Sequence, residues 1–214
     1  MSRVILDQWA PPDLLPPQTH RIARRRRMVL CPPQIWLDNF VDTNGTALHL
    51  HTPDIGSGGY TDEVVQLSIE SNECQVTSGS AVRSHFNPGN NVCTISGTAS
   101  LAAAANCRAQ IRYTTGNTCV QLQVAQGSSS NIKIQKVVSG TATTLATGSV
   151  TINAATSFTF SLQADGSNNL TSKINGANTL SANDATNSTQ TACALSLSAA
   201  SASTWFKPIQ VTTP

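Results

Sequence analysis

Hydrophobic and polar residues alternate along most of the chain, in short runs that are separated by turn-forming residues. In one run, for example, Phe158, Phe160 and Leu162 fall on one face, and the residues between them are polar. This period of two is typical of strands that bury one face, and no helical pattern of similar length competes with it. The clearest runs predict strands at residues 64–70, 107–113, 119–124, 132–138, 158–164, 170–175, 193–197 and 205–211.

Turn signals between these runs predict how the strands are joined. Asp165 with Gly166 and Asn175 with Gly176 are the strongest hairpin signals, and short strands joined by such turns pair antiparallel. A chain of 214 residues, of which 39% are hydrophobic, can fill one large core. Residues 35–214 are therefore predicted to form one all-β, antiparallel β-sandwich. Only residues 78–106, which are Ala-rich and loosely patterned, give no clear strand register.

Residues 1–34 differ from the rest of the chain. Proline pairs at positions 11–12, 16–17 and 32–33 block both helix formation and ladder pairing, so an extended arm is expected. The arm holds more apolar residues than solvated tails do, which predicts that it packs on its own sandwich, on another protein or on a neighbouring copy. The residues expected to make this contact are Trp9, Leu14, Leu15, Arg24, Arg25, Arg26 and Arg27.

Charged residues make up only 11% of the chain, against roughly a quarter in an average soluble protein. A polar but weakly charged composition suits extracellular modules, fibres and viral shells, because hydroxyl and amide side chains tolerate strand pairing. The formal net charge is +2, and residues 1–34 hold six arginines against Asp7 and Asp13, a balance of +4 that leaves −2 for the remainder.

The four consecutive arginines from Arg24 to Arg27 form the strongest charged site. Such a cluster attracts nucleic acid, but no aromatic residues interleave with it and no reading element accompanies it, which argues against a nucleic-acid partner. Planar guanidiniums also form bidentate pairs with carboxylates. An acidic surface on a partner protein is therefore the favoured target.

No apolar run approaches the roughly 20 residues that span a bilayer, so no membrane association is expected. The start of the chain also lacks a secretory signal, which predicts synthesis and assembly in the cytosol. In that compartment the six cysteines are expected to be free thiols. Cys107 shares strand parity with Ala109, Ile111 and Tyr113, opposite Arg108, Gln110 and Arg112, and Cys193 shares parity with Leu195 and Leu197, so both cysteines are predicted to be small core residues. Cys74, Cys93 and Cys119 lie near predicted strand ends, which leaves open a bridge between two of them formed after cell lysis. No Cys-x-x-Cys spacing supports a zinc site.

Residues 38–60 read DNFVDTNGTALHLHTPDIGSGGY, and their turn formers predict the first hairpin of the sandwich. This stretch resembles the opening of concanavalin-like (laminin-G-like) jelly-roll modules that recur in structural proteins of tailed bacteriophages. The residues that carry the match are Phe40, Asn44, Gly45, Thr46, His51, Pro53, Asp54 and Gly56. The run 131–180 resembles the closing half of the same family, through Ile132, Ile134, Lys136, Thr144, Leu145, Ala146, Asn175 and Gly176.

The resemblance implies a jelly roll over about residues 36–211, with the arm outside it. It also implies that His51, Pro53 and Asp54 form a structural corner, which is closed by hydrogen bonds to the backbone. The architecture hosts lectins, glycan hydrolases and inert shell proteins alike. By itself, therefore, the resemblance implies no activity.

A catalytic constellation is missing from the sequence. Asp62 and Glu63 are adjacent and so point to opposite faces of a strand, whereas glycan hydrolases need two carboxylates across one scissile bond. Neither a nucleophile elbow nor a phosphate-binding loop is present. A non-enzymatic protein without cofactors is predicted.

Metal binding is not expected either. His49 and His51 alternate with leucines on a predicted strand and would share a face, but only Asp54 is near enough in sequence to join them. The residues that offer oxygen ligands to calcium lack the spacing of a calcium-binding loop. These calcium candidates are Asp38, Asp42 and Asn44.

Together these features lead to the hypothesis of a non-enzymatic structural protein in the virion of a tailed phage, first of all a capsid decoration or cement protein. It would assemble in the host cytoplasm, bind the major capsid protein or another virion protein through its arm, and form a homo-oligomer, with a trimer favoured. The alternative is a glycan- or receptor-binding module on a phage tail or fibre. Its aromatic platforms would be Tyr60, Tyr113 or Trp205, although Tyr113 and Trp205 have inward parity.

Overall fold

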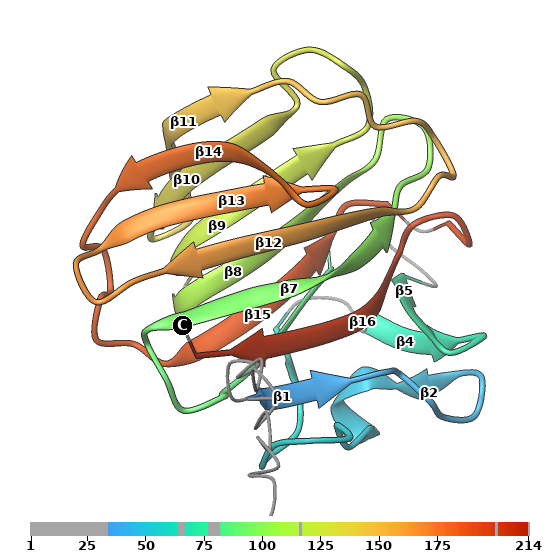
Figure 1. Cartoon of the computed structure of the whole chain (residues 1–214). Coiled ribbons are helices and arrows are strands. Elements are labelled where there is room, and N and C mark those ends of the chain that lie inside the picture. Colours follow the sequence, from blue (N-terminus) through green and yellow to red (C-terminus); the bar gives the residue numbers. More distant parts are fainter. Residues whose placement is uncertain (1–33, 64–66, 77–81, 116, 200, 214) are drawn as a thin grey trace, which may run out of the picture. The chain divides into compact units, whose positions relative to one another are not determined.

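The computed structural model describes residues 34–63, 67–76, 82–115, 117–199 and 201–213. These residues form two antiparallel β-sheets, whose strands Figure 1 shows as two layers, and one turn of 3-10 helix, η1 (Leu48–Leu50). The all-β, antiparallel sandwich predicted from the alternation of residues is thereby confirmed. Among the described residues, no helix has the length and hydropathy that a bilayer span requires.

Sheet A contains nine strands, and β1 (Gln34–Asp38) joins it by pairing with β16. The spatial order of the others is β14 (Ala177–Asn183), β13 (Asn169–Ile174), β12 (Phe158–Ala164), β7 (Cys93–Ser100), β16 (Trp205–Thr212), β5 (Glu73–Val76), β4 (Leu67–Glu70) and β2 (Thr46–Ala47). Sheet B has seven strands, in the order β11 (Thr141–Gly148), β10 (Ile132–Val138), β9 (Thr118–Ala125), β8 (Asn106–Thr114), β15 (Ala192–Leu197), β6 (Val82–Phe86) and β3 (Thr61–Asp62). The chain changes sheet repeatedly, for example from β7 to β8 and from β14 to β15, so strands distant in sequence become neighbours (Figure 1).

Most of the predicted strands are confirmed. β10 and β12 match the predicted ranges at both ends, and β8, β9, β13, β15 and β16 match within one residue at each end. The Ala-rich stretch without a clear register contains β6 and β7, and the structure describes residues 82–100, from the start of β6 to the end of β7. Of the predicted strand 64–70, only β4 falls within the described residues.

The hydrophobic core lies between the two sheets, and Phe158, Phe160 and Leu162 contribute to it as predicted. Cys107 and Cys193 are 2% and 0% exposed within the same core, so these two positions are confirmed as small core residues. The cysteines within the described residues carry free, buried thiols.

The prediction of a hairpin at residues 38–60 is wrong. The segment contains β2, which pairs with β4, and then the helical turn η1, which is closed by a hydrogen bond from the His51 N–H to the Leu48 carbonyl at 3.1 Å. Two Leu-His repeats are too short to distinguish a strand from a turn. His49 and His51 therefore do not share a strand face: the His49 side chain is 43% exposed, and that of His51 is 6% exposed.

The predicted alternation of inward and outward side chains along β8 is wrong at the C-terminal end of the strand. Arg112 has φ +55, and the register with β9 shifts between Ile111 and Thr114, so a bulge reverses the alternation. Arg112 is 2% exposed, and its Nη1 donates to the Asp184 carbonyl at 2.9 Å. Tyr113 packs with a separate apolar cluster rather than with the main core. Trp205 also departs from its inward parity, since it is only half-buried while its neighbour Phe206 is in the core.

The predicted arm lies outside the described residues, apart from Gln34, which begins β1. Its role in attachment therefore stays a prediction. The same holds for the residues named for that contact, which are Trp9, Leu14, Leu15, Arg24, Arg25, Arg26 and Arg27.

Candidate functional site

The corner expected around His51 is built from two buried ionisable groups, His51 and Asp38, and the exposed Asp42. The two ring nitrogens of His51 lie 2.9 Å from Asp38 Oδ1 and 3.0 Å from Asp42 Oδ2. The Asp38 carboxylate also accepts hydrogen bonds from the Phe40 N–H at 2.6 Å and from the Tyr60 hydroxyl at 2.8 Å. These contacts join the end of β1 to the loop that follows η1, so the cluster positions backbone segments.

The other residues of the corner have separate partners. Pro53 is buried, and Asp54 Oδ2 accepts a hydrogen bond from the Asn39 N–H at 2.8 Å. Asp54 thus bonds to the backbone, whereas His51 bonds to carboxylates. The oxygens of the calcium candidates accept hydrogen bonds from protein donors, and that of Asn44 bonds to the Ser71 N–H at 2.8 Å. Within the part of the chain that the structure describes, no cluster of three or more His, Cys, Asp or Glu side chains could hold a metal.

The stability of this corner should depend on pH. Burial lowers the pKa of His51, but its hydrogen bonds to Asp42 and Asp38 outweigh burial and hold the pKa above the ordinary 6.5. A raised folded-state pKa stabilises the fold fully below the unfolded value, and this contribution disappears as the pH rises through the folded value. We therefore expect His51→Gln to lower the free energy of unfolding more at about pH 6 than at about pH 9, as measured by urea unfolding.

The stabilisation by the pair of His51 and Asp42 should also decrease at acid pH. The hydrogen bond from His51 lowers the pKa of Asp42, so on the acid side the contribution is lost as the pH falls through that lowered value. The control is His49→Gln, which removes an exposed pair with Asp62 and should cost no more than about 1 kcal/mol. Equal losses for His51→Gln at both pH values would contradict the role assigned to the imidazolium.

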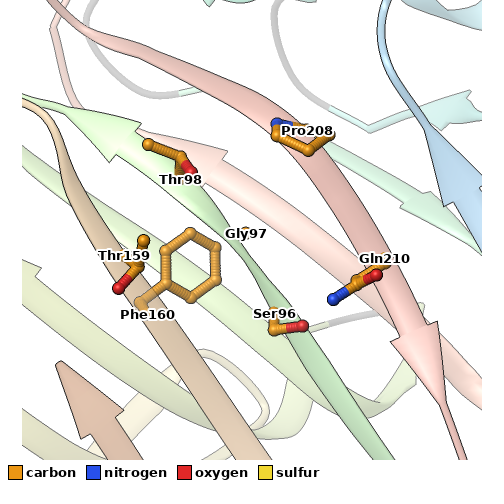
Figure 2. Close-up of a pocket in the computed structure, with 7 residues that line it drawn as sticks. All are labelled: Ser96, Gly97, Thr98, Thr159, Phe160, Pro208 and Gln210. Atoms are coloured by element: carbon orange, nitrogen blue, oxygen red, sulfur yellow. The ribbon is translucent and has the colours of Figure 1, made fainter. Parts of the chain in front are cut away.

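A first hollow lies on the outer face of sheet A, beside Gly97 (Figure 2). A Cβ at Gly97 would lie 2.4 Å from the Pro208 carbonyl oxygen and 2.6 Å from Ile209 Cδ1, so the glycine allows the bulge of β16 to approach β7 closely. The hollow has a volume of about 230 Å³, and none of its lining residues is charged. We attribute it to this backbone packing. The lining consists of Ser96, Gly97, Thr98, Thr159, Phe160, Pro208 and Gln210.

A second hollow, of about 170 Å³, lies on the outer face of sheet B, and we call it the sheet B hollow. Its volume equals that of roughly five or six water molecules in the liquid, which is room for part of a ligand. Amide and guanidinium groups dominate its lining, and no acidic residue belongs to it. The lining consists of Arg83, Arg108, Asn117, Gln121, Gln123, Gln135, Val137, Gly140 and Ala142.

Strand register arranges these side chains in rows across sheet B. Residues that are partners on neighbouring strands point to the same face, so a continuous series of partners forms a row. The basic row runs from β6 through β15, β8 and β9 to β10, and consists of Arg83, Ser196, Arg108, Gln123 and Lys133. The amide row lies next to it, and consists of His85, Ala194, Gln110, Gln121, Gln135 and Thr144.

The two arginines of the basic row differ in their partners. Arg83 Nη1 lies 3.5 Å from Glu63 Oε2 and 3.4 Å from the Tyr113 hydroxyl. Arg108 is half-buried, and its Nε is buried without a hydrogen-bond partner among the described residues. Burial lowers the pKa of Arg108, and the positive charge of Arg83 lowers it further. Arg83 thus has a carboxylate partner, whereas Arg108 has a like charge, that of Arg83, as its neighbour.

The amide row forms a continuous hydrogen-bonded ladder. Gln110 Nε2 donates to Gln121 Oε1 at 2.9 Å, and Gln121 Nε2 donates to Gln135 Oε1 at 2.8 Å. Gln135 Nε2 continues to Thr144 Oγ1 at 3.3 Å. The three glutamines are between 0% and 7% exposed. Because each amide is held by its neighbours, the floor of the sheet B hollow is rigid and polar.

Aromatic side chains do not form an open platform in this hollow. Tyr113 is 2% exposed, stacks on His85 with a centroid distance of 5.5 Å, and donates its hydroxyl to Glu63. Burial raises the pKa of Tyr113 to about 12, and the bond to Glu63 contributes. Tyr60 is 4% exposed in the main core, and Trp205 belongs to sheet A. The three aromatic residues considered as sugar platforms therefore do not line the sheet B hollow.

The adjacent carboxylates of Asp62 and Glu63 diverge, as the alternation of side chains along a strand requires. Asp62 accepts a hydrogen bond from the Ser84 hydroxyl and lies 2.7 Å from His49 Nδ1. Glu63 instead interacts with Tyr113 and Arg83. The two carboxylates therefore have separate partners and do not face each other across a common site.

No family model matches the chain, and no curated protein sequence matches it. Among solved structures, the carbohydrate-binding module CBM66 from Bacillus subtilis is similar with a TM-score of 0.54 and 11% identity, over 72% of this chain and 92% of that one. The β-glucanase of Bacillus licheniformis gives a TM-score of 0.54 and 10% identity, over 84% and 98%. The carbohydrate recognition domain of Emp47p gives 0.51 and 10%, over 83% and 97%.

The fold is a concanavalin-like jelly roll. The jelly-roll part of the sequence resemblance is thus confirmed. At these identities the similarity concerns the fold alone, and none of the three structures is a phage virion protein. The link to phages therefore rests on the sequence resemblance.

The sequence contained part of the signal for the sheet B hollow. Alternation alone placed Arg108 and Gln110 on the face opposite to the core, and the structure places them there. What the pattern did not show is that residues as distant as Arg83 and Gln135 line the same hollow. That proximity depends on the order of the strands in sheet B.

Proposed function

We propose that this jelly roll is a non-catalytic glycan-binding module and that the sheet B hollow is its binding site. The observation that carries the proposal is the lining of the hollow, where hydrogen-bonded amides and two guanidinium groups surround a polar cavity. A sugar presents many hydroxyls that both donate and accept, and planar side chains with several donors and acceptors match them. The buried ladder keeps these groups in place before a ligand arrives, which reduces the entropic cost of binding.

Known proteins of this fold support a sugar as the first ligand class to test. A carbohydrate-binding module and a carbohydrate recognition domain share the architecture, although fold analogy is a weaker argument than the site itself. The absence of acidic residues from the lining favours binding over hydrolysis, because glycosidases place two carboxylates across the scissile bond.

A pair of matched glutamine variants tests this proposal. Gln123 lines the sheet B hollow, and Gln163 is a half-buried glutamine on β12 of sheet A. Once a glycan array has selected a ligand, Gln123→Ala should weaken its binding by about 2- to 10-fold in titration calorimetry, because one hydrogen bond is lost. Gln163→Ala should leave the affinity unchanged. A blank array with well-folded protein, or equal effects of the two variants, would refute the assignment of the site.

A place in a phage virion stays a prediction, as do the partner proteins and the trimeric state. Its basis is the sequence resemblance together with the proline, arginine and apolar content of residues 1–34. A glycan-binding jelly roll is compatible with a tail or fibre, where host recognition takes place. Deletion of residues 1–34 should abolish co-sedimentation with purified particles, and retained binding would exclude the arm as the anchor.

A further inference from the structure

We propose that the ligand of the sheet B hollow is an acidic glycan, whose carboxylate or sulfate groups bind Arg108 in the hollow and then Lys133, which follows on the basic row beyond the lining of the hollow. This inference rests on the proposed glycan-binding function and names the chemical class of the ligand. It predicts that charge, and not sugar identity alone, decides which glycans bind.

Arg108 is a half-buried cation that lacks a counter-charge among the described residues. Within the described part of the chain, no carboxylate forms an ion pair with its guanidinium, and its buried Nε has no hydrogen-bond partner. A half-buried cation that lacks a counter-charge is costly, and the positive charge of Arg83 adds to that cost. An anion placed against Arg108 would supply both the missing charge and acceptors for its donors.

The spacing along the basic row fits an extended chain of sugars. Arg83, Arg108 and Lys133 lie on alternate strands, and adjacent strands are about 4.8 Å apart, so successive cations are roughly 10 Å apart. This is comparable with a two-sugar repeat in an extended polysaccharide. Arg83 already forms an ion pair with Glu63, whereas Lys133 is half-buried and forms no ion pair within the described residues. Arg108 and Lys133 therefore supply the attraction.

The remaining surface favours sugars over nucleic acid. Ser196 and Gln123 lie between the cations of the row, and they can bond to hydroxyls between two acidic groups. Single-stranded nucleic acids stack their bases on exposed aromatic rings, but the ring of Tyr113 is covered by His85 and Arg83. A chain of hydroxyls and acidic groups matches the row better than a chain of bases does.

The test compares charged and neutral polysaccharides of the same backbone, with the full-length protein in titration calorimetry at low salt. De-esterified homogalacturonan is paired with its fully methyl-esterified form, and dextran sulfate is paired with dextran. We expect at least one charged probe to bind about 10-fold or more tightly than its neutral partner, with an affinity that falls as salt is added. The first pair reports on carboxylates and the second on sulfates. Equal binding within both pairs would overturn the inference, as would tighter binding of a single-stranded oligonucleotide that Arg108→Gln weakens.

Charge variants assign the effect to the row. Arg108→Gln should weaken binding of the acidic probe by about 10- to 100-fold, since a charge-assisted contact is lost. Lys173→Gln, which removes an exposed cation from β13 of sheet A, should have no effect. Lys133→Gln gives an independent readout if Arg108→Gln does not fold. A full-affinity Arg108→Gln variant would refute the acidic ligand, and the glycan-binding function would still stand if Gln123→Ala weakened binding of a neutral glycan.

Discussion

Replacing Asp38 with alanine should destabilise the fold by about 3–5 kcal/mol, because it breaks a buried pair with His51 and removes the acceptor of two further buried hydrogen bonds. The Asp38 side chain is 0% exposed and accepts hydrogen bonds from the Phe40 N–H, from His51 and from the Tyr60 hydroxyl. Burial raises the pKa of Asp38, against which these hydrogen bonds act. Loss of the carboxylate leaves the three donors unsatisfied in the interior. Urea unfolding at neutral pH measures the effect.

A second aspartate in the same region provides the control. Asp54 is exposed and accepts one hydrogen bond, from the Asn39 N–H, so Asp54→Ala should cost only about 0.5–1.5 kcal/mol. A comparable loss for the two variants would show that the buried cluster is not the source of stability. In the Asp38→Ala background, His51→Gln should cost less than in the wild type, since directly interacting residues are not additive.

Alternation predicted the strands whose two faces differ clearly in environment. In β12, Phe158, Phe160 and Leu162 meet the core while the residues between them face outward, so the pattern and the structure agree residue by residue. The reversal at Arg112 was not predictable in this way. A residue with φ +55 carries no signature when it is an arginine, because positive φ is expected of glycine or asparagine. A single such residue moves Tyr113 to the other face.

The sheet B hollow illustrates what the local pattern lacks. The outward position of Arg108 followed from its parity, but Arg83 enters the same row only because β15 pairs with both β6 and β8. This pairing joins segments about ninety residues apart in the chain, such as Arg108 and Ser196. Hydrophobic alternation specifies which face a residue occupies and leaves open which strands become neighbours.

Trp36 is a buried core residue of β1, and its contacts show why its loss should be severe. It is 0% exposed, stacks on Phe86 with a centroid distance of 4.6 Å, and meets the edge of Tyr60 at 5.8 Å. Trp36 lies on β1 of sheet A and Phe86 on β6 of sheet B, so the indole fills space between the two sheets. We expect Trp36→Ala to cost about 3–5 kcal/mol in urea unfolding. Trp205→Ala, at a half-buried site, should cost clearly less.

A double-mutant cycle between Trp36 and Gly56 should separate two causes of strain. Gly56 has φ +116, and a Cβ there would lie 2.6 Å from Trp36 Cε3. In the wild type, Gly56→Ala should therefore cost about 2–5 kcal/mol, from strained backbone and from overpacking together. In the Trp36→Ala background the ring is gone, so Gly56→Ala should cost about 1–3 kcal/mol from the backbone alone. Equal costs in the two backgrounds would mean that the indole does not determine the need for glycine, and that backbone conformation accounts for it.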